Sequence, residues 1–157
     1  MQFDEQMLQQ ITIDVCQSML GLELLPMSPG NDMAHQLVAS VEIRGTRHTI
    51  VEVFADDQLM ASIAEVMFAS DRGSLSEEEI RDAFCEIANM IGGNVKGTYG
   101  EEANLSLPVF GSAQDWIETL PQGSLRTTFK CCGHPLTIIL REVAAPSAEL
   151  VGSVTSA

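Results

Sequence analysis

Basic residues are scarce in this 157-residue chain, in which 8 Lys and Arg stand against 22 Asp and Glu, for a formal net charge of −14. Nucleic-acid binding depends on lysines and arginines clustered at the phosphates, so DNA and RNA are poor partners, as is an anionic membrane surface. No apolar run approaches the roughly 18 residues of a membrane-spanning helix. The N-terminal segment "MQFDEQMLQQ" is acidic where a secretion signal is basic. We therefore expect a cytoplasmic protein without membrane insertion.

The sequence also lacks the compact motifs of self-sufficient hydrolases. We find no phosphate-binding Gly-x4-Gly-Lys loop, no histidine pair at helical spacing, and no Ser-His-Asp or Cys-His arrangement. The segment "CCGH" at 131–134 offers three potential zinc ligands, but a Cys-x-x-Cys or His-x3-His pairing is missing and the segment is typical of a hairpin turn. We expect no metal site. Four cysteines scattered through a chain without an export signal indicate reduced, mostly buried thiols: Cys16, Cys85, Cys131 and Cys132.

What the sequence does contain is the pattern of a folded domain. Hydrophobic residues make up 45% of the chain and charged residues 19%, which is ordinary for a globular protein. Apolar periodicity and turn residues predict the elements along the chain. In order, they are a helix over 3–20, a loop over 24–33, a hairpin of strands 35–45 and 48–56, a short helix over 59–67, a helix that begins after Ser76, and strands 104–111, 124–132 and 134–143.

This order of elements predicts the fold class. Helices and strands do not alternate as they do in a parallel βαβ fold, so we expect an α+β fold with a largely antiparallel sheet packed with helices. The length suits one compact core, which we assign to a single domain over residues 1–145. The remaining segment, 146–157, is rich in small residues and weakly patterned, and we expect it to be a flexible tail.

The helix after Ser76 is the most informative segment of the chain. Ser76 and Glu79 form the pattern of a capping box, which fixes where the helix begins. Turned by about 100° per residue, the apolar side chains gather on one arc: Ile80, Phe84, Ile87, Ile91 and Val95. The opposite arc is polar or open: Asp82, Glu86, Asn89, Gly93 and Lys96. The helix therefore presents a carboxylate and a carboxamide side by side, away from the core.

Two interpretations of this polar arc remain open: a site that faces a partner, and an ordinary solvated surface. A polar arc on an amphipathic helix is usually a solvated surface, and Glu-x-x-Asn is a weak pattern that Glu101 and Asn104 repeat in a predicted loop.

The glycines at 92 and 93 are costly in a helix, by about 1 kcal/mol each relative to alanine. Gly93 either leaves space for another surface to approach the helix or, together with Gly92, marks where the helix ends.

The spacing Asp82-x3-Glu86-x2-Asn89 on a helix, followed by a glycine-rich exit and by Pro108 in a strand reading "LSLPVF", resembles the CheC/CheX/FliY family of bacterial chemotaxis phosphatases. In that family an Asp or Ser, a Glu and an Asn lie on one helix, with a proline downstream. The stretch "EIANMIGGNVKG" is most similar to the single-site CheX branch. The first helix contains no asparagine, so it cannot supply the second site of the two-site CheC members.

The resemblance implies a CheX-like fold and a protein phosphatase that hydrolyses the aspartyl phosphate of a CheY-type response regulator. Asn89 would orient the attacking water and Glu86 would dock the regulator, with Asp82, Gly93 and Pro108 in supporting or partner-binding roles. The chain would bind no cofactor of its own, and Mg²⁺ is expected on the partner regulator. The resemblance also implies a homodimer. The alternatives are a non-catalytic CheX-like module that binds a regulator, and a plain acidic scaffold.

Overall fold

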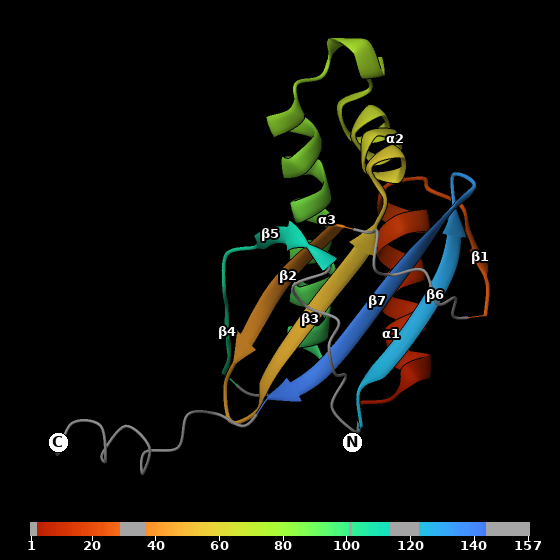
Figure 1. Cartoon of the computed structure of the whole chain (residues 1–157). Coiled ribbons are helices and arrows are strands. Elements are labelled where there is room, and N and C mark those ends of the chain that lie inside the picture. Colours follow the sequence, from red (N-terminus) through yellow and green to blue (C-terminus); the bar gives the residue numbers. More distant parts are fainter. Residues whose placement is uncertain (1–2, 29–36, 101, 114–122, 144–157) are drawn as a thin grey trace, which may run out of the picture.

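The chain folds into one antiparallel sheet with helices packed against it (Figure 1). The computed structural model describes residues 3–28, 37–100, 102–113 and 123–143. The helical elements of this part are α1 (Glu5–Ile13), which continues as the π-helical turn η1 (Asp14–Met19), then α2 (Asp57–Phe68), the short 3₁₀ turn η3 (Arg72–Ser74) and α3 (Glu77–Gly97). The strands are β1 (Leu24–Pro26), β2 (Leu37–Arg44), β3 (His48–Ala55), β4 (Asn104–Leu105), β5 (Val109–Ser112), β6 (Leu125–Cys131) and β7 (His134–Val143).

The sheet confirms the predicted α+β class. Its strand order in the described part is β1-β6-β7-β3-β2-β4. Strand β5 also pairs with β2, and every pairing is antiparallel. Both predicted hairpins are present, since β2 pairs with β3 and β6 with β7. The second hairpin turns at Cys132 and Gly133, whose φ angles of 51° and 83° are those of a tight hairpin turn, as expected for the segment "CCGH".

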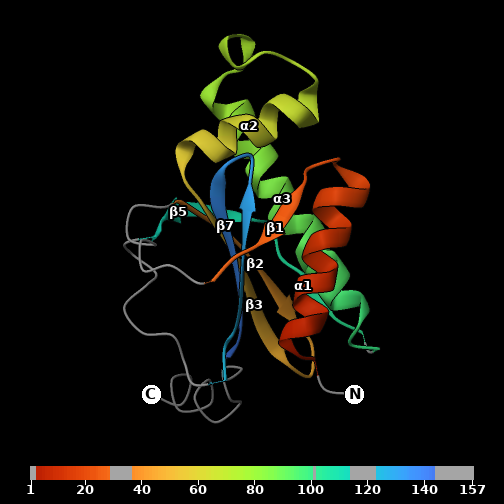
Figure 2. The same cartoon turned by 90° about the vertical axis from the view of Figure 1, so that its right-hand side faces the viewer.

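The helices α1 and α3 lie on the same side of the sheet (Figure 2). They bury the alternate residues of the central strands in one continuous core, whose largest fully buried members include Phe84, Ile87, Ile91, Ile43 and Ile138. The helix α2 packs against the N-terminal half of α3, and both project past the end of the sheet in Figure 1. A smaller second cluster, of Val38, Phe54, Ala113 and Ile139, is separate from this core.

Helix α3 begins as predicted and ends later than the glycine pair. The Ser76 hydroxyl accepts from the Glu79 N–H at 3.1 Å, and the Glu79 carboxylate accepts from the Ser76 N–H at 3.0 Å, which completes the capping box. The helix then runs without a break to Gly97. The alternative in which Gly92 and Gly93 end the helix is therefore wrong.

The two glycines have different surroundings. A Cβ added to Gly92 would overlap the Val41 side chain of β2 and would lie 3.2 Å from Leu105 of β4, so only glycine lets the helix approach the sheet this closely. A Cβ added to Gly93 would meet only Leu105, at an ordinary 4.0 Å. Close approach to the protein's own sheet explains Gly92, whereas Gly93 stands on the open side of the helix.

Two predictions about loops and strands need correction. The loop expected over 24–33 contains strand β1, which pairs with β6 at the edge of the sheet; Leu24 is buried, and an edge strand tolerates Pro26. The strand expected over 104–111 is split into β4 and β5, and Pro108 lies between them, outside either strand. The segment 146–157 lies outside the described residues, as does Glu101.

Candidate functional site

The polar arc of α3 holds together as the sequence predicts. Asp82 and Glu86 are exposed one turn apart, Asn89 is half-buried on the next turn, and Gly93 follows on the turn after it. All four belong to one continuous helix, so their side chains and the open position at Gly93 share one face. The opposite face of α3 carries the fully buried Phe84, Ile87 and Ile91, and their burial fixes the rotation of the helix about its own axis.

Pro108 lies in a bulge at the edge of the sheet. Leu105 pairs with Ile43 and Val109 pairs with Ser40, so three residues of the edge strand, 106–108, stand opposite two residues of β2. One extra residue in an edge strand is a β-bulge, and a proline is tolerated there because the ladder is interrupted. We call residues 106–108 the edge bulge.

Ser106 holds the edge bulge to β2. Its backbone N–H donates to the Glu42 carbonyl oxygen at 2.8 Å, and its hydroxyl oxygen accepts from the Glu42 N–H at 2.8 Å. The same hydroxyl lies 3.1 Å from the Leu107 carbonyl oxygen, to which it donates. A side chain thus replaces the backbone acceptor that the interrupted ladder lacks.

The edge bulge runs beside the motif helix. At one end, Leu105 packs against Gly92 of α3. At the other end, the Phe110 ring meets Phe84 edge to face, with ring centroids 6.3 Å apart, and the Arg81 guanidinium lies 4.7 Å above the Phe110 ring.

These two contacts define one side of α3. Counted in fours from Arg81, the row of positions along the helix is Cys85, Asn89 and Gly93, and Gly92 lies on the adjoining row. The chain segment between Leu105 and Phe110 is the edge bulge. Of Asp82, Glu86 and Asn89, Asn89 is by helical periodicity the one nearest this side of α3. The contacts with α3 described above are made by Leu105 and Phe110, on either side of Pro108.

The electrostatics of the face are simple. Glu77, Glu78 and Glu79 occupy the first turn of α3, where carboxylates are favoured by the helix dipole, and Asp82 and Glu86 continue the negative charge along the arc. Burial raises the pKa of the Cys85 thiol, and the Asp82 carboxylate raises it further. Cys85 therefore stays protonated at neutral pH and is not poised as a nucleophile.

A shallow hollow of about 420 Å³ opens beside the end of the polar arc. It is lined by Gly93, Lys96, Gly97, Gly100 and Glu102. Three of these five residues are glycines, so backbone atoms form much of the wall of the hollow, which is open to solvent. It extends the exposed face of α3 beyond Asn89, and its charged side chains are Lys96 and Glu102.

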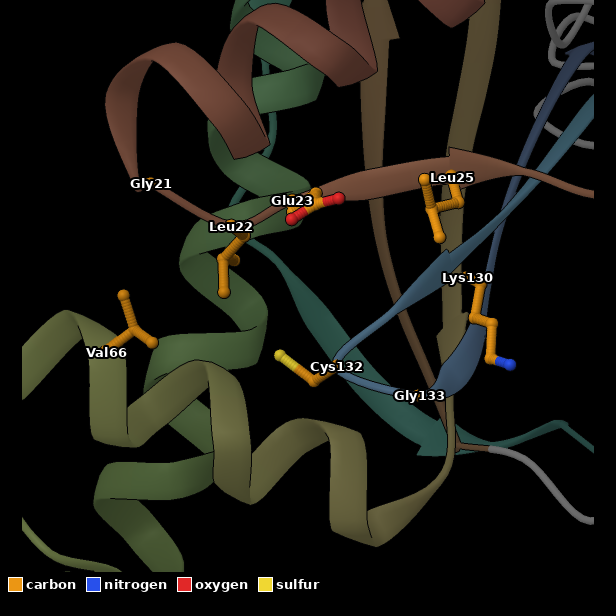
Figure 3. Close-up of a pocket in the computed structure, with 8 residues that line it drawn as sticks. All are labelled: Gly21, Leu22, Glu23, Leu25, Val66, Lys130, Cys132 and Gly133. Carbon is orange, nitrogen blue, oxygen red and sulfur yellow. The ribbon is translucent and has the colours of Figure 1, made fainter.

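A second pocket, of about 410 Å³, lies elsewhere in the molecule (Figure 3). Its walls come from the segment after η1, from β1, α2 and β6, and from the β6–β7 turn: Gly21, Leu22, Glu23, Leu25, Val66, Lys130, Cys132 and Gly133. The exposed Cys132 thiol points toward Leu22 in this view. None of the residues that the sequence singles out as a catalytic candidate lines it.

Among the potential zinc ligands of the segment "CCGH", His134 has a structural partner. His134 Nδ1 lies 2.9 Å from Asp56 Oδ2, and the other oxygen of Asp56 caps α2 by accepting from the Leu59 N–H. Cys16 and Cys131 are buried, and all four cysteines are free thiols. Across the described ranges, no group of three or more His, Cys, Asp or Glu side chains is placed to hold a metal ion. Within the same ranges, no helix is both long and apolar enough to span a membrane.

Sequence reasoning located the motif helix but missed two features beside it. It did not single out Leu107, whose side chain is 86% exposed in the edge bulge. It also did not separate the role of Gly92 from that of Gly93. A signal for the bulge exists in "LSLPVF", because Pro108 interrupts the alternation of an otherwise regular strand.

Comparison with solved structures finds the same fold in chemotaxis proteins. A chain in the crystal structure of the CheX–CheY–BeF3–Mg²⁺ complex from Borrelia burgdorferi is similar with a TM-score of 0.70 and 16% identity over 87% of this chain and 96% of that chain. The chemotaxis protein CheX from Vibrio vulnificus gives 0.67 and 19% over 87% and 93%. A CheC-like protein from Shewanella oneidensis gives 0.64 and 20% over 87% and 95%. No curated protein matches the chain.

The sequence itself matches a protein family. The family description is "Chemotaxis phosphatase CheX", and the match covers residues 37–131, which contain the motif helix, the edge bulge and most of the sheet. This range is more than half of the chain. The chain therefore belongs to the chemotaxis phosphatase CheX family, as its motif helix and its fold had indicated.

Proposed function

We propose that this protein is a phosphatase that accelerates hydrolysis of the aspartyl phosphate of a CheY-type response regulator. The observation that carries the proposal is the pair of Glu86 and Asn89, presented together on the open face of a capped helix in a chain of the CheX family. The similar structure from Borrelia burgdorferi was solved as a complex of CheX with CheY, BeF3 and Mg²⁺, which supports a CheY-like partner here.

Asn89 is the residue we assign to the attacking water. A carboxamide can accept a hydrogen bond from the water and donate one to a phosphoryl oxygen, so it fixes the water without changing its own protonation. Phosphoryl transfer depends mainly on positioning and on charge stabilisation, and a water held in line with the P–O bond gains much of the available rate. Asn89 is half-buried, which restricts its rotamers before the partner arrives.

Glu86 is the residue we assign to docking. Its carboxylate is exposed one turn before Asn89, so it can pair with a lysine at the regulator's active site while Asn89 reaches the phosphoryl group. This pairing fixes the register of the two proteins. The water oxygen bonds to phosphorus as the bond between phosphorus and the aspartyl oxygen breaks. The aspartate leaves as a carboxylate, and the protons of the water pass to the inorganic phosphate and to solvent.

The supporting residues have positional roles in this proposal. Asp82 extends the carboxylate arc toward the helix start, and Gly93 leaves the face open one turn beyond Asn89. Pro108 stiffens the edge bulge on the Asn89 side. The Mg²⁺ that phosphoryl transfer requires would come with the regulator, and this chain would bind no cofactor.

A phosphate-release assay tests the proposal. CheY-type regulators of the same organism are phosphorylated and mixed with the chain and Mg²⁺, and phosphate release is compared with spontaneous decay. We expect Asn89→Ala to lower kcat on the order of 100-fold, the scale of losing a positioning group. Glu86→Ala should mainly raise KM. Asn94→Ala is a matched control, because Asn94 lies on the same helix but on another face, where its amide donates to the Met90 carbonyl oxygen.

Two results would contradict the proposal. No acceleration with any regulator, together with binding to one of them, would instead identify a non-catalytic module that docks the regulator. Full activity in Asn89→Ala and Glu86→Ala would place the chemistry elsewhere on the chain. Loss of activity in the Asn94→Ala control as well would point to a general disturbance of α3.

We also propose a cytoplasmic homodimer and a single domain over residues 1–145. These proposals rest on the family and on the composition, and support for one domain comes from the continuous core that joins α1, α3 and the sheet. Sedimentation velocity at several concentrations tests the dimer, since a monomer at micromolar concentration would exclude it.

A further inference from the structure

We propose that Lys96, beside the hollow at the end of the polar arc, is a docking contact that binds an acidic side chain of the response regulator. The inference rests on the proposed function and deepens it. Glu86 and Asn89 meet the reacting groups of the regulator, and Lys96 holds a carboxylate on the acidic surface around them. The partner is the same CheY-type regulator, recognised here by its charge.

The first support is that the charge of Lys96 is unused within the protein. The chain has 8 lysines and arginines. Its arginines all have partners inside the protein: Arg44, Arg47, Arg72, Arg81, Arg126 and Arg141. In the described part of the chain, Lys96 forms no ion pair, not even with Glu102, which lines the same hollow. Its ammonium group is therefore available to a partner.

The second support is the place of Lys96 on the polar arc. Lys96 follows Asn89 by nearly two full turns of α3, so both residues lie on the same side of the helix. Helical side chains lean toward the N-terminus, so that of Lys96 leans toward the turn of Gly93. Gly93 has no side chain to stand between the ammonium group and Asn89. The lysine and the amide are therefore open to one common partner.

The third support is the size of the footprint that a regulator needs. A protein–protein interface of ordinary size buries about 800 Å² on each partner, which corresponds to a disc of about 16 Å radius. Two turns of a helix separate Lys96 from Asn89 by only about 10 Å along the axis. A footprint centred on Asn89, where the phosphoryl group is proposed to lie, therefore includes Lys96 and the hollow beside it.

The fourth support is charge complementarity. An aspartyl phosphate is anionic, and Mg²⁺ beside it is held by carboxylate oxygens, so the regulator presents an acidic surface around its reacting group. The first half of the polar arc is acidic too, with Asp82 and Glu86 after three glutamates in the first turn of α3. Lys96 is the cation of this arc, at its other end. Opposite charges on the two sides of Asn89 therefore fix the orientation of the docked regulator.

Lys96 also has a role within the helix, and that role predicts a different result. It lies in the last turn of α3, where the helix dipole favours a cation. This contribution to stability requires no partner. Loss of the dipole interaction alone lowers the melting temperature and leaves regulator affinity unchanged, so the two roles separate when both quantities are measured.

The test compares Lys96→Glu with Lys130→Glu. Both substitutions change the net charge of the chain equally, so their long-range effect on an acidic partner is matched. Lys130 is exposed on β6, beside the edge strand β1, and lines the pocket of Figure 3. KM and kcat are measured with the phosphorylated regulator. The dissociation constant is measured with the same regulator activated by beryllofluoride and Mg²⁺, at about 50 mM and about 500 mM salt.

We expect Lys96→Glu to raise KM and the dissociation constant roughly tenfold at the lower salt concentration, with kcat changed less than about twofold. The difference from the wild type should shrink at the higher concentration, where charges are screened within a few ångströms. Lys96→Gln should show about a threefold loss of affinity, and Lys96→Arg should retain the affinity of the wild type. Lys130→Glu should stay within about twofold of the wild type.

Four results would overturn the proposal. Equal losses in Lys96→Glu and Lys130→Glu would mean that only the overall charge matters. Unchanged affinity in Lys96→Glu and Lys96→Gln with a lowered melting temperature would leave Lys96 its helix-end role alone. Weaker self-association of Lys96→Glu with unchanged regulator affinity would assign the residue to a contact between copies of the chain. An affinity loss of the same size at both salt concentrations would exclude an ion pair.

The Asn89→Ala variant separates this inference from the proposed function. An inactive Asn89→Ala beside a Lys96→Glu variant of normal KM and affinity rejects the docking contact and leaves the proposed function intact. Full activity in Asn89→Ala rejects the proposed site itself, and the docking contact with it.

Discussion

Gly92 and Gly93 are neighbours in the sequence, yet the space around their Cα atoms differs. Gly92 stands on the buried side of α3, where an added methyl group would overlap Val41. Gly93 stands one residue further round the helix, with only Leu105 within 4.0 Å of an added Cβ. From the sequence alone, both glycines lower the helix propensity of α3. The fold requires Gly92 because Val41 of β2, about fifty residues earlier in the chain, lies against it.

We predict opposite effects of alanine at these two positions. Gly92→Ala should lower the free energy of unfolding by about 1–2 kcal/mol, because the cost of overpacking exceeds the gain of about 1 kcal/mol in helix propensity. Gly93→Ala should raise it by up to about 1 kcal/mol. Urea denaturation of the two variants measures the difference directly. Equal stabilisation by both substitutions would show that α3 does not press against β2 as closely as described.

At the residue scale, the sequence predicts the motif well. Asp82, Glu86 and Asn89 fall on one arc through helical periodicity alone, and the structure places them on one face of α3, with Asp82 and Glu86 exposed and Asn89 half-buried. Leu107 could not be predicted as exposed, because its position depends on the register of the edge strand against β2. Register is set by hydrogen bonds between distant segments and leaves little trace in a local pattern.

At the scale of elements, local signals predict the long helices and the hairpins, while short edge strands escape prediction. The capping box locates the start of α3 because both of its members lie within one turn of each other. Strand β1 has three residues, one of them Pro26, and its partner β6 follows about a hundred residues later. Nothing near residue 24 in the sequence indicates that partner, so the segment reads as a loop.

The capping box allows a prediction about α3 as an element. Ser76→Ala removes the side-chain acceptor of the Glu79 N–H and should lower the free energy of unfolding by about 1 kcal/mol. Guanidinium denaturation measures the loss. Ser18→Ala, at an exposed position of η1, is the control and should stay within about 0.5 kcal/mol of the wild type. A Ser76→Ala variant as stable as the wild type would mean that the cap contributes nothing in solution.

At the scale of the whole molecule, the order of elements predicts the fold class but not the order of strands in the sheet. The missing βαβ alternation is sufficient to predict an antiparallel sheet. Placing β7 at the centre, between β6 and β3, requires the long-range pairing of residues 137–143 with 48–54. The side of the sheet that the helices cover likewise follows from packing that no single segment encodes.

The proposed domain boundary gives a prediction for the whole chain. Strand β7 ends at Val143, and the core residues described above all precede that residue. Deletion of residues 146–157 should therefore change the melting temperature by less than about 2 °C. Phosphate release should also keep its kcat/KM. A melting temperature lowered by more than about 5 °C would place the C-terminal segment inside the folded domain.

The projection of α2 and the start of α3 past the end of the sheet divides the motif helix into two halves (Figure 1). Ile91 and Val95 of the C-terminal half are fully buried, and in the N-terminal half Phe84 is fully buried as well and meets Phe110 of β5. Local opening of a helix is rarer where more apolar surface is buried. Asn89 stands between the fully buried Ile87 and Ile91, so the amide that we propose to hold the water is carried by a turn of the helix that is anchored on both sides.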